Sequence, residues 1–345
     1  MRIATYNVEW FNSLFDDTGR LLEDDGWSGR HGVRRAVQIT ALGTVFRAVD
    51  ADAVMVIEAP DESRHRATHV ALESFAARFG LRTNTALLGF RNDTQQEIAL
   101  LYDPARLTAR HDPMGTFTGR RGSHPVPRFD GTYRIDLDID GTEDVVTFSK
   151  PPLEVAAVSA SGRAFRMIGV HIKSKAPHGA VDENEVMRLS IQNRRKQLAQ
   201  AIWLRERVLA QLARGDSLMV MGDFNDGPGL DEYEKLFGRS AVEIVMGWNA
   251  PKPERLYDAN ARRALAQRIA AQPATARFWV PDEGTGHYLS ALLDYIMVSP
   301  DLRALQPRWR IWHPFDDPAC YGDPVLREAL LTASDHFPVS IDLPL

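Results

Sequence analysis

Short apolar runs recur from one end of the chain to the other. They are rich in Val, Ile and Leu and too short for helices, which favours buried strands. Seven runs have this character: Ile3 to Tyr6, Ala53 to Ile57, Ile98 to Tyr102, Val155 to Val158, Met167 to Val170, Leu218 to Met221 and Tyr295 to Val298. We predict a strand at each of them.

Three segments between these runs have apolar residues at helical spacing. Residues 33–49 include Val37 in the apolar pattern, and residues 64–79 include Val70. The longest segment, 183–214, places Arg and Gln on one side and Leu, Ile and Val on the other, and Gly215 and Asp216 should end it. We predict a helix in each segment.

The order of these elements predicts packed sheets with helices outside. Strands follow one another without helices from about residue 97 to 171, with turn signals at Asp140-Gly141 and Ser161-Gly162, so this region should form antiparallel hairpins. Hairpins mixed with helices argue against a purely parallel sheet. Segments rich in Gly, Pro or charge are predicted to be loops, and they cover residues 12–31, 112–132, 174–184 and 246–290. A single domain over 1–345 is the simplest interpretation.

Composition narrows the class of protein. The chain has 345 residues, 44% hydrophobic and 25% charged, which is typical of globular proteins. No stretch of about 18 apolar residues occurs, so we expect no transmembrane helix. The N-terminus lacks the pattern of a secretory leader, and Cys320 is the only cysteine, which excludes an intrachain disulfide and a Cys-based metal site. We therefore expect a cytoplasmic location, and we see no evident protein partner.

Polar residues at the ends of the predicted strands are the informative feature. Six strand ends carry Asp, Glu, Asn or His: Asn7 and Glu9; Glu58; His171; Asp223, Asn225 and Asp226; Asp294; and Asp335-His336. Any one of them alone is more typical of a turn or a helix cap. Together, carboxylate and amide oxygens with few His and no Cys suit a hard divalent cation. Mg²⁺ fits best, Mn²⁺ can substitute, and Zn²⁺ is disfavoured because it prefers nitrogen or sulfur ligands.

These residues lie in motifs that resemble a known family. The segments TYNVEWF, VIEAPD, GVHIKSK, VMGDFNDGPG, LLDYIMVS and SDHFPV occur in an order similar to that of the endonuclease/exonuclease/phosphatase superfamily, and they extend from Asn7 to His336. That group includes deoxyribonucleases, abasic-site nucleases, sphingomyelinase-like phospholipases and inositol polyphosphate phosphatases. The resemblance implies an α/β fold, a four-layer α/β/β/α sandwich of two mostly antiparallel sheets flanked by helices, with the site at one edge.

The resemblance also implies roles for individual residues. Glu58 would be the principal metal carboxylate, with Asn7 and Asp335 as further ligands. Asp223 would orient or deprotonate the attacking water. Four side chains complete the implied site: Asn225 as a phosphate ligand that positions Asp223, His336 on the scissile phosphate, Asp294 as its carboxylate partner, and His171 as a second phosphate-binding or proton-donating group.

The implied chemistry explains these residue types. An anionic phosphodiester repels hydroxide until positive charge screens its oxygens, which a cation at Glu58 would do. Asp294 would raise the pKa of His336 enough to keep the imidazole charged. Asp223 can act as a base only if its surroundings raise its pKa.

The chain departs from the family pattern at two positions. Ile57 precedes Glu58 where family members often have Gln, which affects the fine geometry of the metal site. Lys150 stands where the family usually carries Arg, so it would bind phosphate as a point charge; a solvated strand end is the alternative.

Other basic residues leave alternatives open. The segment 119–128 is either a phosphate clamp or lid, or an ordinary surface loop. Lys173 is expected to bind phosphate at the basic edge of the site. On the long helix, the resemblance implies a structural ion pair for one of Arg194 and Arg195, whereas a solvated helical face is the favoured interpretation of these basic residues.

Three functions remain to be compared. The first is a Mg²⁺- or Mn²⁺-dependent hydrolase of phosphodiester bonds, most plausibly a nuclease whose partner is DNA or RNA. The second has the same chemistry with a lipid or small-molecule phosphoester as substrate. The third is a catalytically silent scaffold. We disfavour it because a scaffold has no need of Glu58, Asp223 and His336 together. The net charge of −5 leaves the substrate open.

Overall fold

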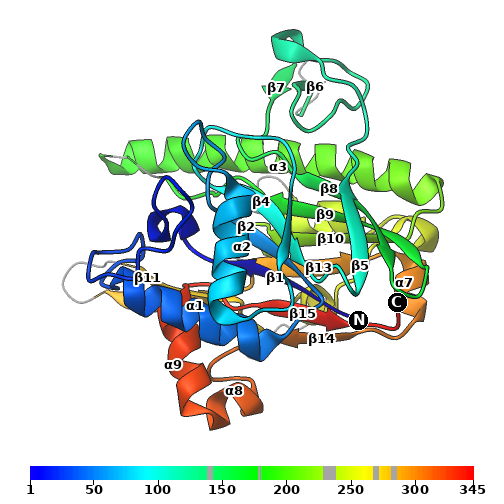
Figure 1. Cartoon of the computed structure of the whole chain (residues 1–345). Coiled ribbons are helices and arrows are strands. Elements are labelled where there is room, and N and C mark those ends of the chain that lie inside the picture. The colour runs from blue at the N-terminus through cyan, green and yellow to red at the C-terminus, as the bar shows by residue number, and fades with distance from the viewer. Residues whose placement is uncertain (138–142, 178, 180, 228–237, 267–271, 281–285) are drawn as a thin grey trace.

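Two β-sheets packed face to face form the centre of the molecule, and helices cover their outer faces (Figure 1). The computed structural model describes residues 1–345 except 138–142, 178, 180, 228–237, 267–271 and 281–285. The predicted four-layer α/β/β/α sandwich is confirmed. The single-domain organisation over 1–345 stays a prediction.

The first sheet has six strands in the order β14-β15-β1-β2-β4-β3. Neighbouring strands are antiparallel except β1 and β2, which are parallel. The pairing of β1 with β15 brings the two ends of the chain together (Figure 1). The strands are β1 Arg2–Asn7, β2 Ala53–Ala59, β3 Thr85–Leu88, β4 Glu97–Tyr102, β14 Arg308–Ile311 and β15 Val339–Asp342.

The second sheet has five strands in the order β13-β10-β9-β8-β5, and only β9 and β10 are parallel neighbours. Two small hairpins, β6–β7 and β11–β12, lie outside the main sheets. These strands are β5 Leu107–His111, β6 Tyr133–Ile135, β7 Asp144–Val146, β8 Leu153–Ser159, β9 Ala164–His171, β10 Leu218–Asp223, β11 Ala276–Val280, β12 His287–Ala291 and β13 Asp294–Val298.

Three apolar layers hold these elements together. Ile3 and Met55 of the first sheet pack against Met167 and Met219 of the second in a fully buried middle layer. Helices α1 (Arg35–Val49), α2 (Thr68–Phe79) and α9 (Pro324–Ala333) bury the outer face of the first sheet. Helices α3 (Glu183–Ala213) and α5 (Ala241–Met246) bury the outer face of the second. Burial of apolar area on both faces of each sheet is the main stabilising term.

The remaining elements are short. They are the 3-10 helices η1 Phe11–Leu14, η2 Gly119–Arg121 and η3 Lys252–Glu254, and the helices α6 Ala259–Ala266, α7 Pro300–Ala304 and α8 Pro318–Gly322. No helix in the described ranges is long and apolar enough to cross a membrane.

The seven predicted strands and three predicted helices are confirmed. Helix α3 begins at the side chain of Asp182, which accepts a hydrogen bond from the Glu185 N–H, and it ends just before Gly215 in the left-handed region, as the sequence indicates. The turn at Ser161-Gly162 joins β8 to β9. The predicted turn at Asp140-Gly141 lies outside the described residues.

Two sequence-based expectations are wrong. Segment 246–290 is more than a loop, because it contains α6, β11 and β12. Val37 and Val70 lie on the exposed sides of their helices, since each is about half exposed, and other apolar residues of α1 and α2 fill the core.

Candidate active site

Three polar side chains form a row at one end of the five-stranded sheet. In the pairing register Asp223 of β10 lies opposite His171 of β9 and opposite Asp294 of β13. Residues paired across neighbouring strands project from the same face of a sheet, so the three side chains stand next to one another. All three residues are buried.

The segment that follows β10 fixes the orientation of Asp223. The Asn225 backbone N–H donates to Asp223 Oδ1 at 2.7 Å, and its side-chain amide donates to the Ile172 carbonyl at 3.0 Å and to Asp223 Oδ2 at 3.2 Å. Asn225 has a φ of 48°, in the left-handed region that Asn tolerates. Gly222 is required by space, because a Cβ there would lie 2.1 Å from the Val170 carbonyl oxygen.

The six-stranded sheet contributes from the opposite side. Asn7, the last residue of β1, donates from its amide to Asp223 Oδ2 at 3.1 Å and so connects the two sheets. Glu58 lies in β2, where a register shift between Ile57 and Ala59 interrupts the pairing with β4 and gives Glu58 a φ of 62°. Such bulges redirect a side chain, and this one points Glu58 into the site.

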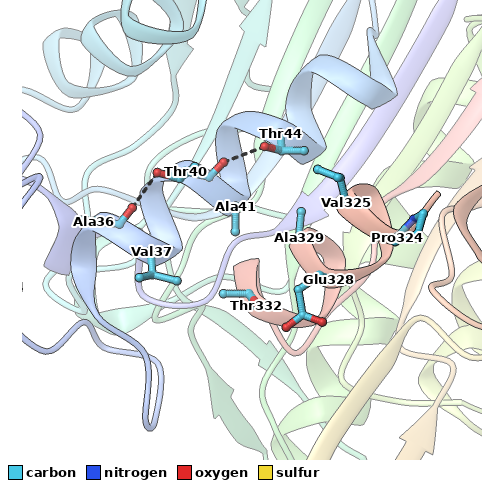
Figure 2. Close-up of a pocket in the computed structure, with 10 residues that line it drawn as sticks. All are labelled: Ala36, Val37, Thr40, Ala41, Thr44, Pro324, Val325, Glu328, Ala329 and Thr332. Atoms are coloured by element: carbon cyan, nitrogen blue, oxygen red, sulfur yellow. Dashed lines mark hydrogen bonds between the residues drawn. The ribbon is translucent and has the colours of Figure 1, made fainter.

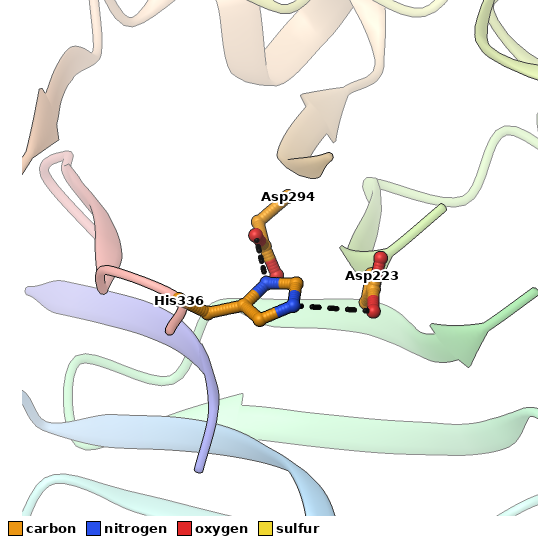
Figure 3. Close-up of side chains that lie close together, drawn as sticks. All are labelled: Asp223, Asp294 and His336. Atoms are coloured by element: carbon orange, nitrogen blue, oxygen red, sulfur yellow. Dashed lines mark hydrogen bonds and ion pairs between the residues drawn. The ribbon is translucent and has the colours of Figure 1, made fainter. Parts of the chain in front are cut away.

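His336 lies in the segment between α9 and β15, at the edge of the site (Figure 3). Its Nδ1 is 2.7 Å from Asp294 Oδ2, and its Nε2 is 3.9 Å from Asp223 Oδ2. The imidazole therefore lies between two buried carboxylates, with Asp294 as its hydrogen-bonding partner.

This arrangement changes the protonation of both groups. Burial alone would lower the pKa of His336, but the carboxylates of Asp294 and Asp223 raise it well above the ordinary value. Burial also raises the pKa of Asp223 to about 7, although the His336 charge opposes the rise. His336 is thus charged at neutral pH, and Asp223 can exchange a proton in the same range.

Asp223, Asp294 and His336 also form a group with ligand atoms within 4.8 Å of one another, a spacing that would suit a metal ion. However, Asp294 already accepts a hydrogen bond from His336, and the positive charge of His336 would repel a cation at that point. Glu58 and Asp335 lie 4.0 Å and 3.9 Å from the imidazoles of His171 and His336 without a hydrogen bond to either, so we favour that side of the cavity for a cation.

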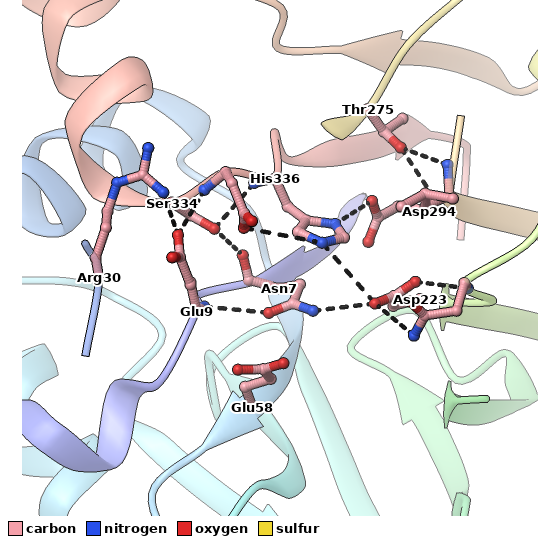
Figure 4. A network of polar contacts seen from close by, with 12 residues as sticks. Asn7, Glu9, Arg30, Glu58, Asp223, Thr275, Asp294, Ser334 and His336 are labelled. Carbon is pink, nitrogen blue, oxygen red and sulfur yellow. Dashed lines mark hydrogen bonds and ion pairs between the residues drawn. The ribbon is translucent and has the colours of Figure 1, made fainter. Parts of the chain in front are cut away.

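A second carboxylate network surrounds Asn7 (Figure 4). The Glu9 backbone N–H donates to Asn7 Oδ1 at 3.1 Å, and the Glu9 carboxylate accepts from the Asp335 N–H at 2.8 Å and from the Arg30 guanidinium. Burial and the neighbouring Asp335 charge raise the pKa of Glu9 to about 7. Glu9 was not among the predicted site residues, although it interrupts the first apolar run as Asn7 does.

This network suits a divalent cation. Glu58, Glu9 and Asp335 line one cavity; Arg30 pairs directly with Glu9, and His336 Nε2 lies 3.9 Å from Asp335 Oδ1. Glu58 Oε2 accepts one hydrogen bond, from the Trp10 N–H at 2.9 Å. The negative charges of these carboxylates repel one another, and this repulsion contributes to the raised pKa of Glu9. Mg²⁺ or Mn²⁺ bound between them would neutralise the charge and stabilise the group.

Lys150, His171 and Lys173 make a basic wall of the cavity, and His171 Nε2 also lies 4.0 Å from Glu58 Oε1. Lys150 Nζ lies 3.3 Å from His171 Nδ1, and His171 Nε2 lies 3.6 Å from Asp223 Oδ2. Burial and the Lys150 charge lower the pKa of His171 well below its usual value, so His171 is neutral. Burial lowers the pKa of Lys150, while the charges of Glu58 and Asp223 oppose this effect. Burial and Lys196 lower the pKa of Lys173, on the same wall.

One cavity of about 480 Å³ therefore collects the predicted residues. Nine of the ten predicted side chains line it, and the tenth, Asp294, lies behind His336. The nine are Asn7, Glu58, Lys150, His171, Lys173, Asp223, Asn225, Asp335 and His336. The sequence missed Glu9, Trp10, Gln96, Ser149 and Ser174 in the same lining. Gln96 comes just before an apolar run, so its position at the start of a predicted strand is the sequence feature that could have identified it.

Behind the cavity, a buried ion pair holds the segment after β10 against α3. Asp226 accepts from Arg194 Nη1 at 2.9 Å, from Lys175 Nζ at 2.7 Å and from the Ala241 N–H at 2.6 Å. Arg194 is 1% exposed, so the expectation that it belongs to a solvated face is wrong. A buried carboxylate in the neighbouring segment explains its position.

A separate hollow of about 670 Å³ lies between α1 and α9 (Figure 2). Its lining is mostly aliphatic and threonine side chains, and Glu328 is the one charged residue in it. It lacks paired titratable groups and therefore has no evident chemistry.

Comparison with known proteins agrees with this architecture. The model of the Endonuclease/Exonuclease/phosphatase family matches residues 4–336, nearly the whole chain. Comparison with curated protein sequences gave no match.

Solved structures with the same fold share few residues with this chain. An AP endonuclease from Archaeoglobus fulgidus superposes with a TM-score of 0.52 at 13% identity, with 100% of each chain covered. A 3'-5' exonuclease from Neisseria meningitidis (16% identity) and a mannosyl-6-phosphatase from Bacteroides thetaiotaomicron (14% identity) each have a TM-score of 0.49 with 100% of both chains covered.

Proposed function

Because the chain belongs to the endonuclease/exonuclease/phosphatase family, whose members are metal-dependent phosphoester hydrolases, we propose that it hydrolyses phosphodiester bonds of DNA or RNA with Mg²⁺ or Mn²⁺. The observation that carries this proposal is one cavity in which Asp223, the His336–Asp294 pair and Glu58 converge. A base, a charged donor and metal-binding oxygens are the three parts that such a hydrolysis needs.

Asp223 is the general base in this proposal. Its carboxylate is held by the Asn225 N–H and the Asn7 amide, so one orientation is fixed before substrate binds. A pKa of about 7 keeps a fraction of the carboxylate ready to accept a proton from water at neutral pH. General bases of this kind contribute roughly 10²- to 10⁴-fold to the rate.

His336 supplies the charged donor. With Nδ1 bonded to Asp294, its Nε2–H is available to a phosphoryl oxygen next to Asp223. A donor fixed in this way stabilises the additional negative charge of the transition state without reorganisation.

The basic wall would bind the non-reacting phosphate oxygens. Lys150 and Lys173 line the cavity, and neutral His171 beside Lys150 can donate a hydrogen bond there. Asn225 stands between this wall and Asp223. The charge of the two lysines favours an anionic, phosphate-rich substrate, which supports nucleic acid over a neutral lipid surface.

Glu58 would be the main ligand of the metal ion, with Asp335, Glu9 and the Asn7 amide oxygen around it. The ion, when bound, supplies positive charge that screens the phosphate and lowers the pKa of the attacking water. The role of Arg30 is to balance Glu9, which it contacts directly.

A substrate panel tests the proposal. Purified protein treated with EDTA is supplied with Mg²⁺ or Mn²⁺ and offered plasmid DNA, single-stranded DNA, RNA, sphingomyelin, inositol phosphates and bis(p-nitrophenyl) phosphate. We expect nucleic acid to be hydrolysed fastest and all activity to depend on the added metal. Faster turnover of a lipid or small phosphoester would replace the substrate assignment, and activity that survives complete chelation would contradict the metal mechanism.

A matched variant controls for contaminating nucleases. His336→Gln should lose nearly all activity, whereas His69→Gln, which changes an exposed His on α2, should retain it. Equal activity of the two variants would show that the hydrolysis does not come from this site.

A further inference from the structure

Trp10 is an exposed aromatic side chain inside the cavity of the candidate active site. It is 44% exposed, and among the described residues that line this cavity it is the one large apolar side chain with substantial exposure, since Ile172 is 1% exposed. The other lining residues are charged, amide, imidazole or hydroxyl groups. Trp27 and Trp279 are also exposed, at 61% and 51%, but neither lines this cavity, so the position of Trp10 beside the polar groups distinguishes it.

The backbone holds Trp10 in this position at an energetic cost. Glu9 has a φ of 49° and Trp10 a φ of 58° with a ψ of 45°, so two successive residues other than Gly lie in the left-handed region. L-residues other than Gly are disfavoured in this region by the close approach of Cβ to the backbone. This conformation leaves Trp10 exposed while the next residue, Phe11, is fully buried. Strain of this kind concentrates at functional sites.

The chain around Trp10 also fixes its backbone. The Trp10 carbonyl accepts from the Ser13 N–H at 3.0 Å and from Ser13 Oγ at 2.8 Å, and the same hydroxyl accepts from the Gly29 N–H at 2.9 Å. Gly29 is required here, because a Cβ at that position would lie 2.4 Å from Trp10 Cβ. The backbone that carries the indole is therefore held in place before substrate binds, which lowers the entropic cost of binding.

We propose that Trp10 is a stacking surface for a nucleobase of the substrate next to the scissile phosphate. The inference rests on the proposed function and adds a substrate determinant to it. The Trp10 N–H already orients Glu58, so the same residue positions a metal carboxylate through its backbone and offers its indole to the substrate. A flat apolar ring fits this surface, while Gln96 and Ser149 in the same lining can bond its polar edge.

Binding to an uncleaved oligonucleotide tests the inference. The Asp223→Asn background slows turnover enough for binding to be measured. Kd is determined with Mg²⁺ for a short single-stranded DNA and for the same strand with abasic residues on both sides of one phosphate. Trp10→Ala should weaken binding of the normal strand roughly 5- to 150-fold and binding of the abasic strand far less. Trp10→Phe, which keeps an aromatic face, should recover most of the affinity.

Three outcomes would overturn the inference. The first is an unchanged Kd in Trp10→Ala. The second is an equal loss of affinity for the normal and abasic strands, which would indicate a structural or sugar-binding role. The third is no binding of either strand by the Asp223→Asn protein. Because Trp10→Ala keeps the backbone N–H, cleavage of the abasic strand by this single variant checks that Glu58 stays in place, since that strand offers no base beside the phosphate. Cleavage of the abasic strand by the unmodified protein tests the proposed chemistry separately from the stacking.

Discussion

Replacing Asp294 by Asn should move the pH range of activity toward acid. The substitution preserves the shape of the side chain and removes the charge that His336 Nδ1 contacts at 2.7 Å. A hydrogen bond to a charged group contributes about 1.5–3 kcal/mol. One pKa unit corresponds to about 1.36 kcal/mol, so the pKa of His336 should fall by roughly one to two units. Asp223, whose Oδ2 lies 3.9 Å from His336 Nε2, still stabilises the charged imidazole. The pKa of His336 therefore loses only part of the increase that the two carboxylates produce.

The sign of the effect follows from which form of each group is active. Catalysis needs His336 protonated, so activity declines as the pH rises through the pKa of His336, which the two carboxylates raise. Activity increases as the pH rises through the pKa of Asp223, about 7, which the Asp294 charge helps to raise. Without that charge, both limbs of the profile should move to lower pH. At a pH above the His336 pKa of the unmodified protein the loss in kcat/KM should reach roughly 10- to 100-fold, and at pH 6 it should be smaller.

The assay is kcat/KM for a soluble phosphodiester between pH 5 and 10 at fixed Mg²⁺. Asp258→Asn is the matched control, because Asp258 is also buried and contacts the same strand, accepting from the Ile296 N–H at 2.9 Å outside the cavity. Its profile should keep the limbs of the unmodified protein. An Asp294→Asn profile that is lower at every pH by one constant factor would refute the reasoning.

Two further predictions concern stability. Arg194→Met should lower the free energy of unfolding by about 1.5–3 kcal/mol, because it removes a buried guanidinium from Asp226 and leaves Lys175 as the cation at 2.7 Å. Arg195→Met, next in sequence and paired with Asp144 on a half-exposed surface, should cost no more than about 1 kcal/mol. Equal losses in urea unfolding would contradict the burial argument. Burial raises the pKa of Asp258 to about 6, so the folded state favours the neutral form of this carboxyl. The free energy of unfolding therefore decreases as the pH rises from about 4 through 6, where the unfolded chain loses this proton more readily than the folded protein does. The stability of the unmodified protein relative to Asp258→Asn should therefore decrease by roughly 3 kcal/mol over that range, and a constant difference would show that the pKa is not raised.

The strands and their terminal residues could be predicted because burial imposes a simple pattern. A buried strand needs a run of apolar residues, and the first polar residue after it marks the edge of the sheet, as at Asp223 and His171. These residues converge on one cavity because of the fold. The order of the motifs along the chain implied that fold through its resemblance to a known family. The sequence alone therefore located most of the cavity lining.

The features that the sequence did not predict depend on tertiary contacts. Trp10 is exposed and Arg194 is buried, each against its usual preference, because of a left-handed backbone in one case and a buried carboxylate in the other. The hairpin of β11 and β12 in segment 246–290 carries exposed residues on a short ladder, so its pattern was too weak to distinguish from a loop.

The rate of phosphodiester hydrolysis by Asp223→Asn tests the central claim most directly. Asn keeps the volume of the side chain and can still accept a hydrogen bond from Asn225, but it cannot take a proton from water. With saturating Mg²⁺ and a folded protein verified by circular dichroism, kcat should fall roughly 10²- to 10⁴-fold. A kcat within about threefold of the unmodified protein would contradict the assignment of Asp223 as the base.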